Sequence, residues 1–466
     1  MPALRVGIFL ENRASDGGAF QQSLSTIKAL SEAMPEYHMV ALTPYTDSLR
    51  VLREAGIESE LYSTGLRGKL DAIQAVSLPV SHVLHVMRRI GFRTLGRDLD
   101  RRLLKLNVDV AIFSSYATAL RLADHPFVVT VWDLCHRDLP EFPGVSLGRE
   151  FERREYCLRI ALPKALAVIV NCPSHAERVM QIYQVARERI LLLPFLPSIA
   201  VRRHAEGKGT VSVKAVRARY NLREDYVFYP AQICADKNHV YILDALVSLQ
   251  AAYGYRIHAV FSGGDKGNRA YLEDYARQLG LLDRVHFLGF VDDDEIPALY
   301  EGARALAMPT YGGPTNLPPL EAAALGCPVI YSDLPEWRVY MGDAALYCDL
   351  KNPRSMADCL HTILTDTALV DRQRAAGRRM ISKLKDATYS EMLRPVLENF
   401  EYVRRRWGRE AGSPGFESEE RENCSAYVAF SFDVRLRRTP ENDWLWGVEH
   451  FGGNWLLPIS ASRQAV

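Results

Sequence analysis

The stretch MPTYGGPTNLPPLEAAALGCPVIYSDLPEW, Met308 to Trp337, decides the fold of this 466-residue chain. Its first residues complete an apolar strand, and a loop with two glycines follows. The next residues are helix-capping types and prolines that fit only in the first turn of a helix: Thr315, Asn316, Pro318 and Pro319. A helix-forming run ends at Gly326, and Cys327 to Tyr331 is the next strand. A strand, loop, helix and strand in this order predict one unit of a parallel α/β sheet.

The start of this predicted helix is a candidate anion site. Free backbone N–H groups and the positive end of the helix dipole suit a diphosphate. Glu321 lies just beyond the prolines, where its carboxylate could accept hydrogen bonds from ribose hydroxyls. An acid that only complements the helix dipole explains Glu321 equally well.

The rest of the chain repeats this alternation of apolar runs and amphipathic stretches, which predicts two parallel sheets with crossover helices. The predicted strands are Arg5–Leu10, His38–Thr43, Val108–Phe113, Phe127–Trp132, Ala167–Asn171, Tyr226–Gln232, Arg256–Ser262, Val285–Phe290 and Arg304–Pro309. The predicted divisions are a domain over 1–195, a polar linker with a short helix over 196–224, a domain over 225–386, a helix over 387–410, and a linker and tail over 411–466. The tail could be a small packed appendage or a poorly ordered segment.

Composition excludes several classes of protein. Lys plus Arg number 57 and Asp plus Glu 56, so the net charge of +1 gives no reason to expect nucleic acid as a partner. No apolar run reaches the roughly 18 residues of a spanning helix, and the first residues form a strand pattern and not a secretory signal. The eight Cys have neither CxxC pairs nor regular spacing, which argues against zinc or a disulfide framework and fits a reducing cytoplasm.

The first half offers two candidate site segments, because ligands of such sheets bind beyond the carboxyl ends of strands. Gly17 and Gly18 follow the first strand and could let backbone approach a phosphate or a sugar, although a plain loop and helix cap explains them as well. Asp133 and His136 follow Trp132 in a charged run and are the candidate catalytic residues of this half. The chain has no GxGxxG, which counts against a dinucleotide dehydrogenase.

The segment 86–105 alternates basic and apolar residues. One interpretation is an amphipathic helix that packs on the sheet with a solvated basic face. The other is a surface that meets anionic lipid head groups at the inner face of a membrane.

Several motifs resemble glycosyltransferase family 4, which has the GT-B fold. The stretch from Phe290 to Asp349 is similar to the family's donor domain, and YPAQICADKNHVYILDAL, from Tyr229, is similar to its strand-to-helix Lys-Asn element. VWDLCHRDLPEFP and VIVNCPSHAERVMQIYQV resemble its first-domain elements. The resemblance covers roughly Arg5 to Trp407. It implies two Rossmann-like domains that face each other across a cleft, with a C-terminal helix crossing back.

The resemblance also implies a retaining, metal-independent and cofactor-free transfer of a hexose, of the mannose or glucose type, from a nucleoside-diphosphate sugar. The acceptor would be a glycan or a lipid-linked molecule held by the first domain, as in surface polysaccharide or lipopolysaccharide synthesis. By the same resemblance, Lys237 holds the diphosphate and acts in catalysis, and Glu321 holds the ribose. The other donor-binding positions are Gly17, Gly18, Gln232, Gly289, Phe290, Thr315, Asn316 and Leu317.

Three positions depart from the family pattern. Gly313 stands where the family usually has Glu, Gln232 where it usually has Arg, and Trp132 where it usually has His. The Gly-Pro-Thr-Asn loop is similar to that of one branch of the family. Two alternatives to a transferase therefore stay open: a nucleotide-sugar epimerase on the same architecture, and a non-catalytic protein that binds nucleotide sugars.

Overall fold

The computed structural model describes residues 3–62, 98–114, 125–313, 316–384 and 387–407, and the strands at 434–438, 444–450 and 453–458. The chain separates into two compact units, Met1–Glu398 and Asn399–Val466. Residues 86–97 of the basic segment, and Thr315 of the donor loop, lie outside the described residues.

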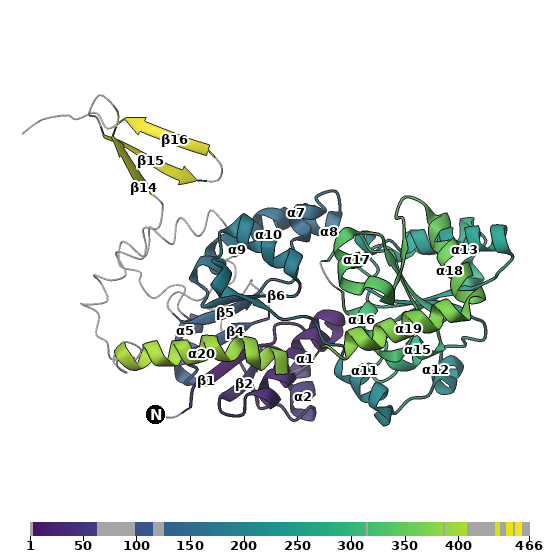
Figure 1. The fold of residues 1–466 in the computed structure, drawn as a ribbon, viewed down its shortest axis with the longest axis horizontal. Helices are drawn as coiled ribbons and strands as arrows, with labels where there is room; N and C mark the ends of the chain where they lie inside the picture. Colours follow the sequence, from purple (N-terminus) through teal and green to yellow (C-terminus); the bar gives the residue numbers. More distant parts are fainter. Residues whose placement is uncertain are drawn as a thin grey trace, which may run out of the picture. The chain divides into compact units, whose positions relative to one another are not determined.

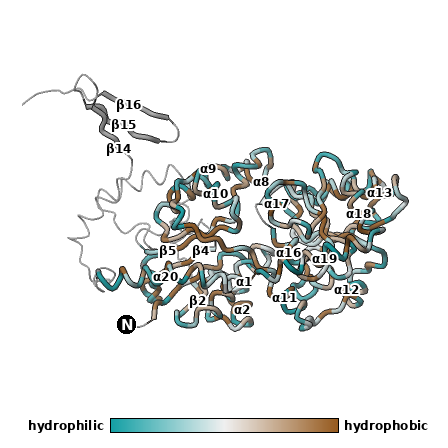
Figure 2. The backbone as a smooth tube through the Cα atoms, viewed as in Figure 1, coloured by the Kyte–Doolittle hydropathy of each residue, from teal (hydrophilic) through white to brown (hydrophobic). Residues whose placement is uncertain are grey.

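The first domain of the larger unit is built on a seven-stranded parallel sheet in the order β3-β2-β1-β4-β5-β6-β7. Its strands are β1 Arg5–Phe9, β2 His38–Thr43, β3 Ser59–Leu61, β4 Val110–Phe113, β5 Phe127–Thr130, β6 Ala167–Val170 and β7 Ile190–Leu192. The main helices are α1 Gly18–Ala33, α2 Thr46–Glu54, α5 Asp98–Lys105, α9 Glu150–Ala161 and α10 Pro173–Tyr183. Hydrophobic segments coincide with strands such as β4 and β5, whose residues are almost entirely buried (Figure 2).

The second domain is a six-stranded parallel sheet in the order β10-β9-β8-β11-β12-β13. Its strands are β8 Tyr226–Pro230, β9 His258–Ser262, β10 Val285–Gly289, β11 Ala305–Met308, β12 Val329–Ser332 and β13 Leu346–Cys348. Its helices are α13 His239–Tyr253, α14 Arg269–Gln278, α15 Ile296–Gly302, α16 Leu317–Leu325, α17 Pro335–Met341, α18 Pro353–Thr365 and α19 Thr367–Ile381. Figure 1 shows α13 and α18 on one side of this sheet and α15 and α19 on the other.

The connection between the domains is more structured than its polar composition suggests. It contains α11, Ile199–Arg203, and α12, Val213–Arg219. Val201 and Val216 are buried, and both helices pack against α15 of the second domain. Most of the predicted linker therefore packs on the second domain, because each short helix has an apolar residue to bury.

The helix α20, Ala387–Trp407, returns to the first domain as predicted. The Tyr389 hydroxyl donates a hydrogen bond to Pro194 O at 2.6 Å, and Arg394 donates to Ala33 O and forms an ion pair with Glu36. Two parallel α/β domains with a returning helix confirm the predicted GT-B fold class.

The smaller unit contains a three-stranded antiparallel sheet of β14 Val434–Arg438, β15 Trp444–His450 and β16 Gly453–Pro458. The tail therefore forms regular structure in its described residues. Among the described helices, none is both long and apolar enough to cross a membrane.

Candidate functional site

The loops that follow β8 and β11 form the centre of the candidate site. These strands are adjacent and parallel, so both connections leave the same edge of the sheet. Asp236 O, in the loop after β8, accepts hydrogen bonds from Tyr311 N at 2.9 Å and from the Thr310 hydroxyl at 3.2 Å, both in the loop after β11. Lys237 therefore lies beside the loop that opens α16.

Lys237 supplies the positive charge of this edge. Its side chain is 26% exposed, and Nζ lies 3.0 Å from Asp236 Oδ2. Burial lowers the pKa of Lys237, but the charge of Asp236 and its hydrogen bond raise it, and the net shift is upward. The ammonium group therefore stays charged at neutral pH and can face an anion.

The first turn of α16 offers backbone donors at the same place. Asn316 is the N-cap residue, but its side chain donates to Tyr331 Oη at 2.6 Å and does not cap the helix. Pro318 and Pro319 have no N–H group, so Leu317 is the one donor among the first three helical residues. The predicted pair of backbone amides, Asn316 and Leu317, is therefore not blocked by a side-chain cap.

Glu321 lies one turn further along α16, and its side chain is buried at 6% residue exposure. Ser198 N donates to Oε1 at 3.4 Å, and the Tyr300 hydroxyl donates to Oε2 at 3.1 Å. Burial raises the pKa of Glu321 to about 7, although both hydrogen bonds lower it. The carboxyl group is thus held out of water with few partners, as expected of a group that binds a ligand.

The Gly-rich loop has a backbone shape that the usual family residue would not adopt easily. Gly313 has φ +98°, and a Cβ there would lie 3.0 Å from the Asn316 side chain. Trp337 Nε1 donates to Gly313 O at 2.8 Å, and the Trp337 ring stacks on Tyr331 at 4.2 Å between ring centroids. A Glu at position 313 would strain this loop. The glycine that stands here in place of the family's usual Glu therefore fits the backbone conformation of the loop.

The remaining donor-binding predictions fall at strand ends of the same domain. Gly289 is the last residue of β10 and has φ +69°, and Phe290 is 56% exposed just after it. Gln232 follows β8 and is partly buried. The described contacts of these three residues neither support nor contradict a role in binding the donor.

In the first domain, Gly17 has φ +62° at the N-terminal end of α1, and a Cβ on Gly17 or Gly18 would meet nothing within 4 Å. The start of α1 therefore borders open space. This agrees with backbone approach to a ligand, and equally with a simple helix cap.

Asp133 and His136 have different surroundings, although they are only three positions apart. Asp133 is 27% exposed, accepts a hydrogen bond from Cys135 N and pairs with Arg154 at 2.8 Å. His136 is fully buried in α7, Cys135–Asp138, and its Nε2 lies 2.9 Å from Glu155 Oε1. The structure keeps Asp133 near the donor loops but turns His136 into the domain.

The first-domain loop after β5 contacts the donor loop directly. The rings of Phe142 and Tyr311 lie 5.1 Å apart. A Cβ on Gly312 would lie 2.6 Å from Leu139 Cδ1 and 3.1 Å from Cys135 Sγ. A larger residue at position 312 would therefore require the Leu139 side chain to move.

Among the residues that contact the predicted ones, sequence reasoning missed Ser198, Tyr300, Asp236 and Arg154. Asp236 is adjacent to Lys237 and could have been identified as its partner. The other three come from distant elements, and no local pattern identifies them. Among the described residues, no three His, Cys, Asp or Glu side chains gather as a metal site.

Two Rossmann-like domains, a short connection and a returning helix define the GT-B class of structures. Residues 46–194 match the family described as Glycosyltransferase Family 4, and residues 214–380 match Glycosyl transferases group 1. The chain thus belongs to the family 4-like glycosyltransferases, a family of enzymes.

Individual relatives agree with this assignment. The D-inositol 3-phosphate glycosyltransferase of Corynebacterium urealyticum is 27% identical over 236 residues, which is 49% of this chain and 54% of the relative. The chain spans about half the length of this relative and of the similar enzymes from Corynebacterium glutamicum and Nocardia farcinica.

Solved structures agree on the fold. Anabaena Alr3699/HepE in complex with UDP-glucose has a TM-score of 0.62 at 16% identity, covering 85% of this chain and 100% of that one. WaaG, a glycosyltransferase involved in lipopolysaccharide biosynthesis, has a TM-score of 0.57 at 16% identity, covering 84% and 98%.

Proposed function

We propose that the chain transfers a hexose, of the mannose or glucose type, from a nucleoside-diphosphate sugar to a glycan or lipid-linked acceptor with retention of configuration. A role in surface polysaccharide or lipopolysaccharide synthesis is part of the proposal. The observation that supports it most is the contact between the loop of Lys237 and the loop that opens α16, the helix that contains the buried Glu321. The UDP-glucose complex of the similar Anabaena protein supports this kind of donor.

In the proposed reaction, the bond between the anomeric carbon and the diphosphate breaks while an acceptor hydroxyl forms the new bond on the same face of the sugar. The acceptor proton leaves with the diphosphate. Negative charge therefore grows on the leaving group, and fixed donors aimed at it stabilise the transition state. Lys237 Nζ and the amides of Asn316 and Leu317 are the groups with this role.

The ribose and base lie further along the same edge in this proposal. Glu321 accepts hydrogen bonds from ribose hydroxyls, and Gly289 and Phe290 lie at the base. Gln232 and Thr315 complete the donor-binding positions of the second domain. Gly17 and Gly18 approach the donor from the first domain.

We assign Asp133 a direct role at the substrate and His136 an indirect role within the first domain. Asp133 borders the donor loops and is proposed to orient the acceptor or the sugar. His136 is proposed to hold the loop after β5 in place through Glu155, its buried partner, because its ring is not exposed.

A donor screen tests the proposal. The purified chain is mixed with UDP-, GDP-, ADP- and dTDP-sugars, and the thermal shift and the release of nucleoside diphosphate are measured. The expected result is a stabilising shift with one family of donors and nucleotide release that needs Lys237. If no donor binds, or if release is unchanged in Lys237→Met, the proposal is overturned.

The same screen separates the two alternatives. An epimerase converts the donor alone into an epimer, which anion-exchange chromatography of the nucleotide sugars detects. A protein that only binds donors shows the thermal shift and neither epimer nor release on any acceptor.

A further inference from the structure

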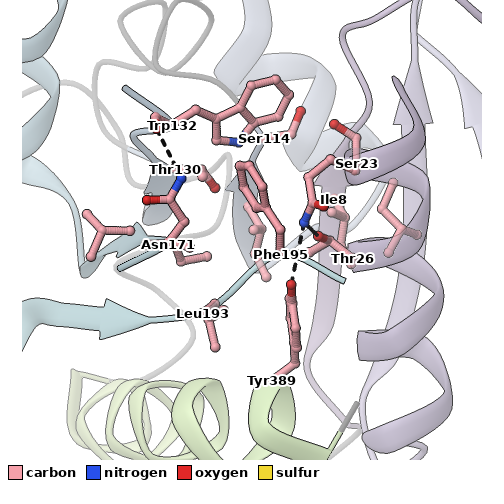
Figure 3. Close-up of a pocket in the computed structure, with 15 residues that line it drawn as sticks. Ile8, Ser23, Thr26, Ser114, Thr130, Trp132, Asn171, Leu193, Phe195 and Tyr389 are labelled. Carbon is pink, nitrogen blue, oxygen red and sulfur yellow. Dashed lines mark hydrogen bonds between the residues drawn. The ribbon is translucent and has the colours of Figure 1, made fainter. Parts of the chain in front are cut away.

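A small cavity lies in the first domain, lined by residues at the carboxyl ends of its strands and by α1 (Figure 3). Its volume is about 30 Å³, enough for about two water-sized groups. Trp132, Phe195 and Thr130 are partly exposed at its rim, whereas Gln22 and Asn171 are buried. Two aromatic residues of the lining are therefore partly accessible to solvent.

Two amide oxygens in the lining lack hydrogen-bond donors from the described protein. Gln22 is 5% exposed, and its Nε2 donates to Thr26 Oγ1 at 3.2 Å, but nothing donates to Oε1. Asn171 is 3% exposed, and its Nδ2 donates to Trp132 O at 3.1 Å, but nothing donates to Oδ1. Leaving a buried polar group unpaired is destabilising, so both oxygens require a donor that is not part of the described chain.

The described lining is also uncharged. Among the residues that the structure describes, it contains no Lys, Arg, His, Asp or Glu side chain. Arg154 of α9 pairs with the Asp133 carboxylate at 2.8 Å, and Asp133 follows Trp132 of the lining in the sequence. A phosphate would find no cation among the described lining residues, whereas hydroxyl groups would supply the donors that both amide oxygens lack.

We propose that this cavity receives a hydroxyl or hydroxymethyl arm of the acceptor, and that the acceptor group bound there is an uncharged sugar or polyol. The apolar C–H face of such a group lies against Trp132 or Phe195, and its hydroxyls donate to Gln22 Oε1 and Asn171 Oδ1. The inference rests on the proposed function, because it assigns the acceptor side of the same reaction to the first domain.

The first test uses the unmodified full chain. Binding of myo-inositol, glucose and methyl α-D-glucopyranoside is measured by saturation-transfer NMR with UDP present, beside D-inositol 3-phosphate and glucose 6-phosphate. At least one neutral compound should bind roughly tenfold more tightly than its phosphorylated form. Equal or tighter binding of the phosphorylated forms overturns the inference. If no neutral compound binds, the cavity holds only water, and the inference is also overturned.

Variants then locate the binding. Asn171→Leu and Gln22→Leu each remove one acceptor oxygen, and loss of both hydrogen bonds should weaken the neutral compound about tenfold. Exposed Gln250→Leu is the matched control. UDP binding should be unchanged in all three variants. Failure of UDP to bind the unmodified chain would instead count against the proposed function, whereas normal UDP binding with no effect of either variant overturns only the cavity's role.

Discussion

Replacing Glu321 by Gln should stabilise the ligand-free protein against unfolding at alkaline pH and should weaken the binding of the donor. The carboxyl group is 6% exposed, and its two neutral donors lie at 3.4 Å and 3.1 Å. Burial raises its pKa to about 7, from an ordinary value of 4.5 for a Glu side chain in water. The folded chain therefore keeps a proton on Glu321 over a pH range in which the unfolded chain has already released it.

The size of the effect follows from this difference in pKa. Below pH 4.5 both states hold the proton, and stability is not reduced. As the pH rises through the window from 4.5 to 7, the unfolded chain ionises first and becomes favoured. Each pKa unit corresponds to about 1.36 kcal/mol, so the unmodified chain should lose about 2.5 kcal/mol between pH 5 and pH 8 through this group alone. Gln has no proton to release and should not show this loss.

Urea unfolding of both forms at pH 5 and pH 8 measures the difference, with exposed Glu188→Gln as the matched control. The free energy of unfolding of Glu321→Gln, relative to the unmodified chain, should rise by about 2.5 kcal/mol between the two pH values. The Glu188 variant should show no such change. If the Glu321 and Glu188 variants respond to pH alike, Glu321 is not held neutral by burial, and the reasoning is refuted.

The same variant should bind the donor more weakly. A charge-assisted hydrogen bond contributes about 1.5–3 kcal/mol, which corresponds to roughly 10- to 150-fold in the donor KM. Because ribose hydroxyls prefer the ionised carboxylate, donor affinity of the unmodified chain should rise with pH through about 7. Affinity independent of pH between 6 and 8 would contradict the ribose contact.

Four further predictions concern separate parts of the chain. Lys237→Met should lower kcat more than donor affinity, because the charge that it faces grows in the transition state, and exposed Lys351→Met should change neither. Activity should survive EDTA, since Lys237 and the start of α16 supply the positive charge; loss with EDTA that a divalent metal restores would contradict this. His136→Asn should lower the free energy of unfolding by about 1–3 kcal/mol through Glu155 and leave the turnover of folded enzyme nearly unchanged; lost turnover at unchanged stability would give the ring a direct catalytic role. Sedimentation with anionic vesicles, measured at low and high salt, should weaken when Gln replaces four arginines, Arg88, Arg89, Arg93 and Arg97. Unchanged sedimentation would exclude the lipid contact.

The sequence predicted most of the fold because parallel sheets leave a strong local signal. β2 matches its predicted range, and β1, β8 and β10 each begin at the predicted residue. In the two parallel sheets, three strands were missed: β3, β7 and β13, each three residues long. Such a short strand has too few residues to show alternation, and its pairing comes from its neighbour.

The donor loops were predictable for a related reason. Lys237 and Glu321 belong to connections that follow strands, and the strand order brings β8 beside β11. Once the strands are known, the carboxyl edge of a parallel sheet collects these loops without further information. The burial of Glu321 was not predictable, because Ser198 and Tyr300 reach it from the interdomain connection and from α15.

The two catalytic candidates of the first domain show where local reasoning ends. Asp133 and His136 lie in one charged loop, and the sequence of this loop favours neither residue over the other as a catalytic residue. Their surroundings are decided by two consecutive residues of α9: Arg154 pairs with Asp133, while Glu155 binds His136 in the interior. Neighbouring positions on a helix point about 100° apart, so one helix turns one candidate toward the donor loops and encloses the other. Which candidate meets the substrate thus depends on how α9 packs on the loop, and no spacing within the loop itself carries that information.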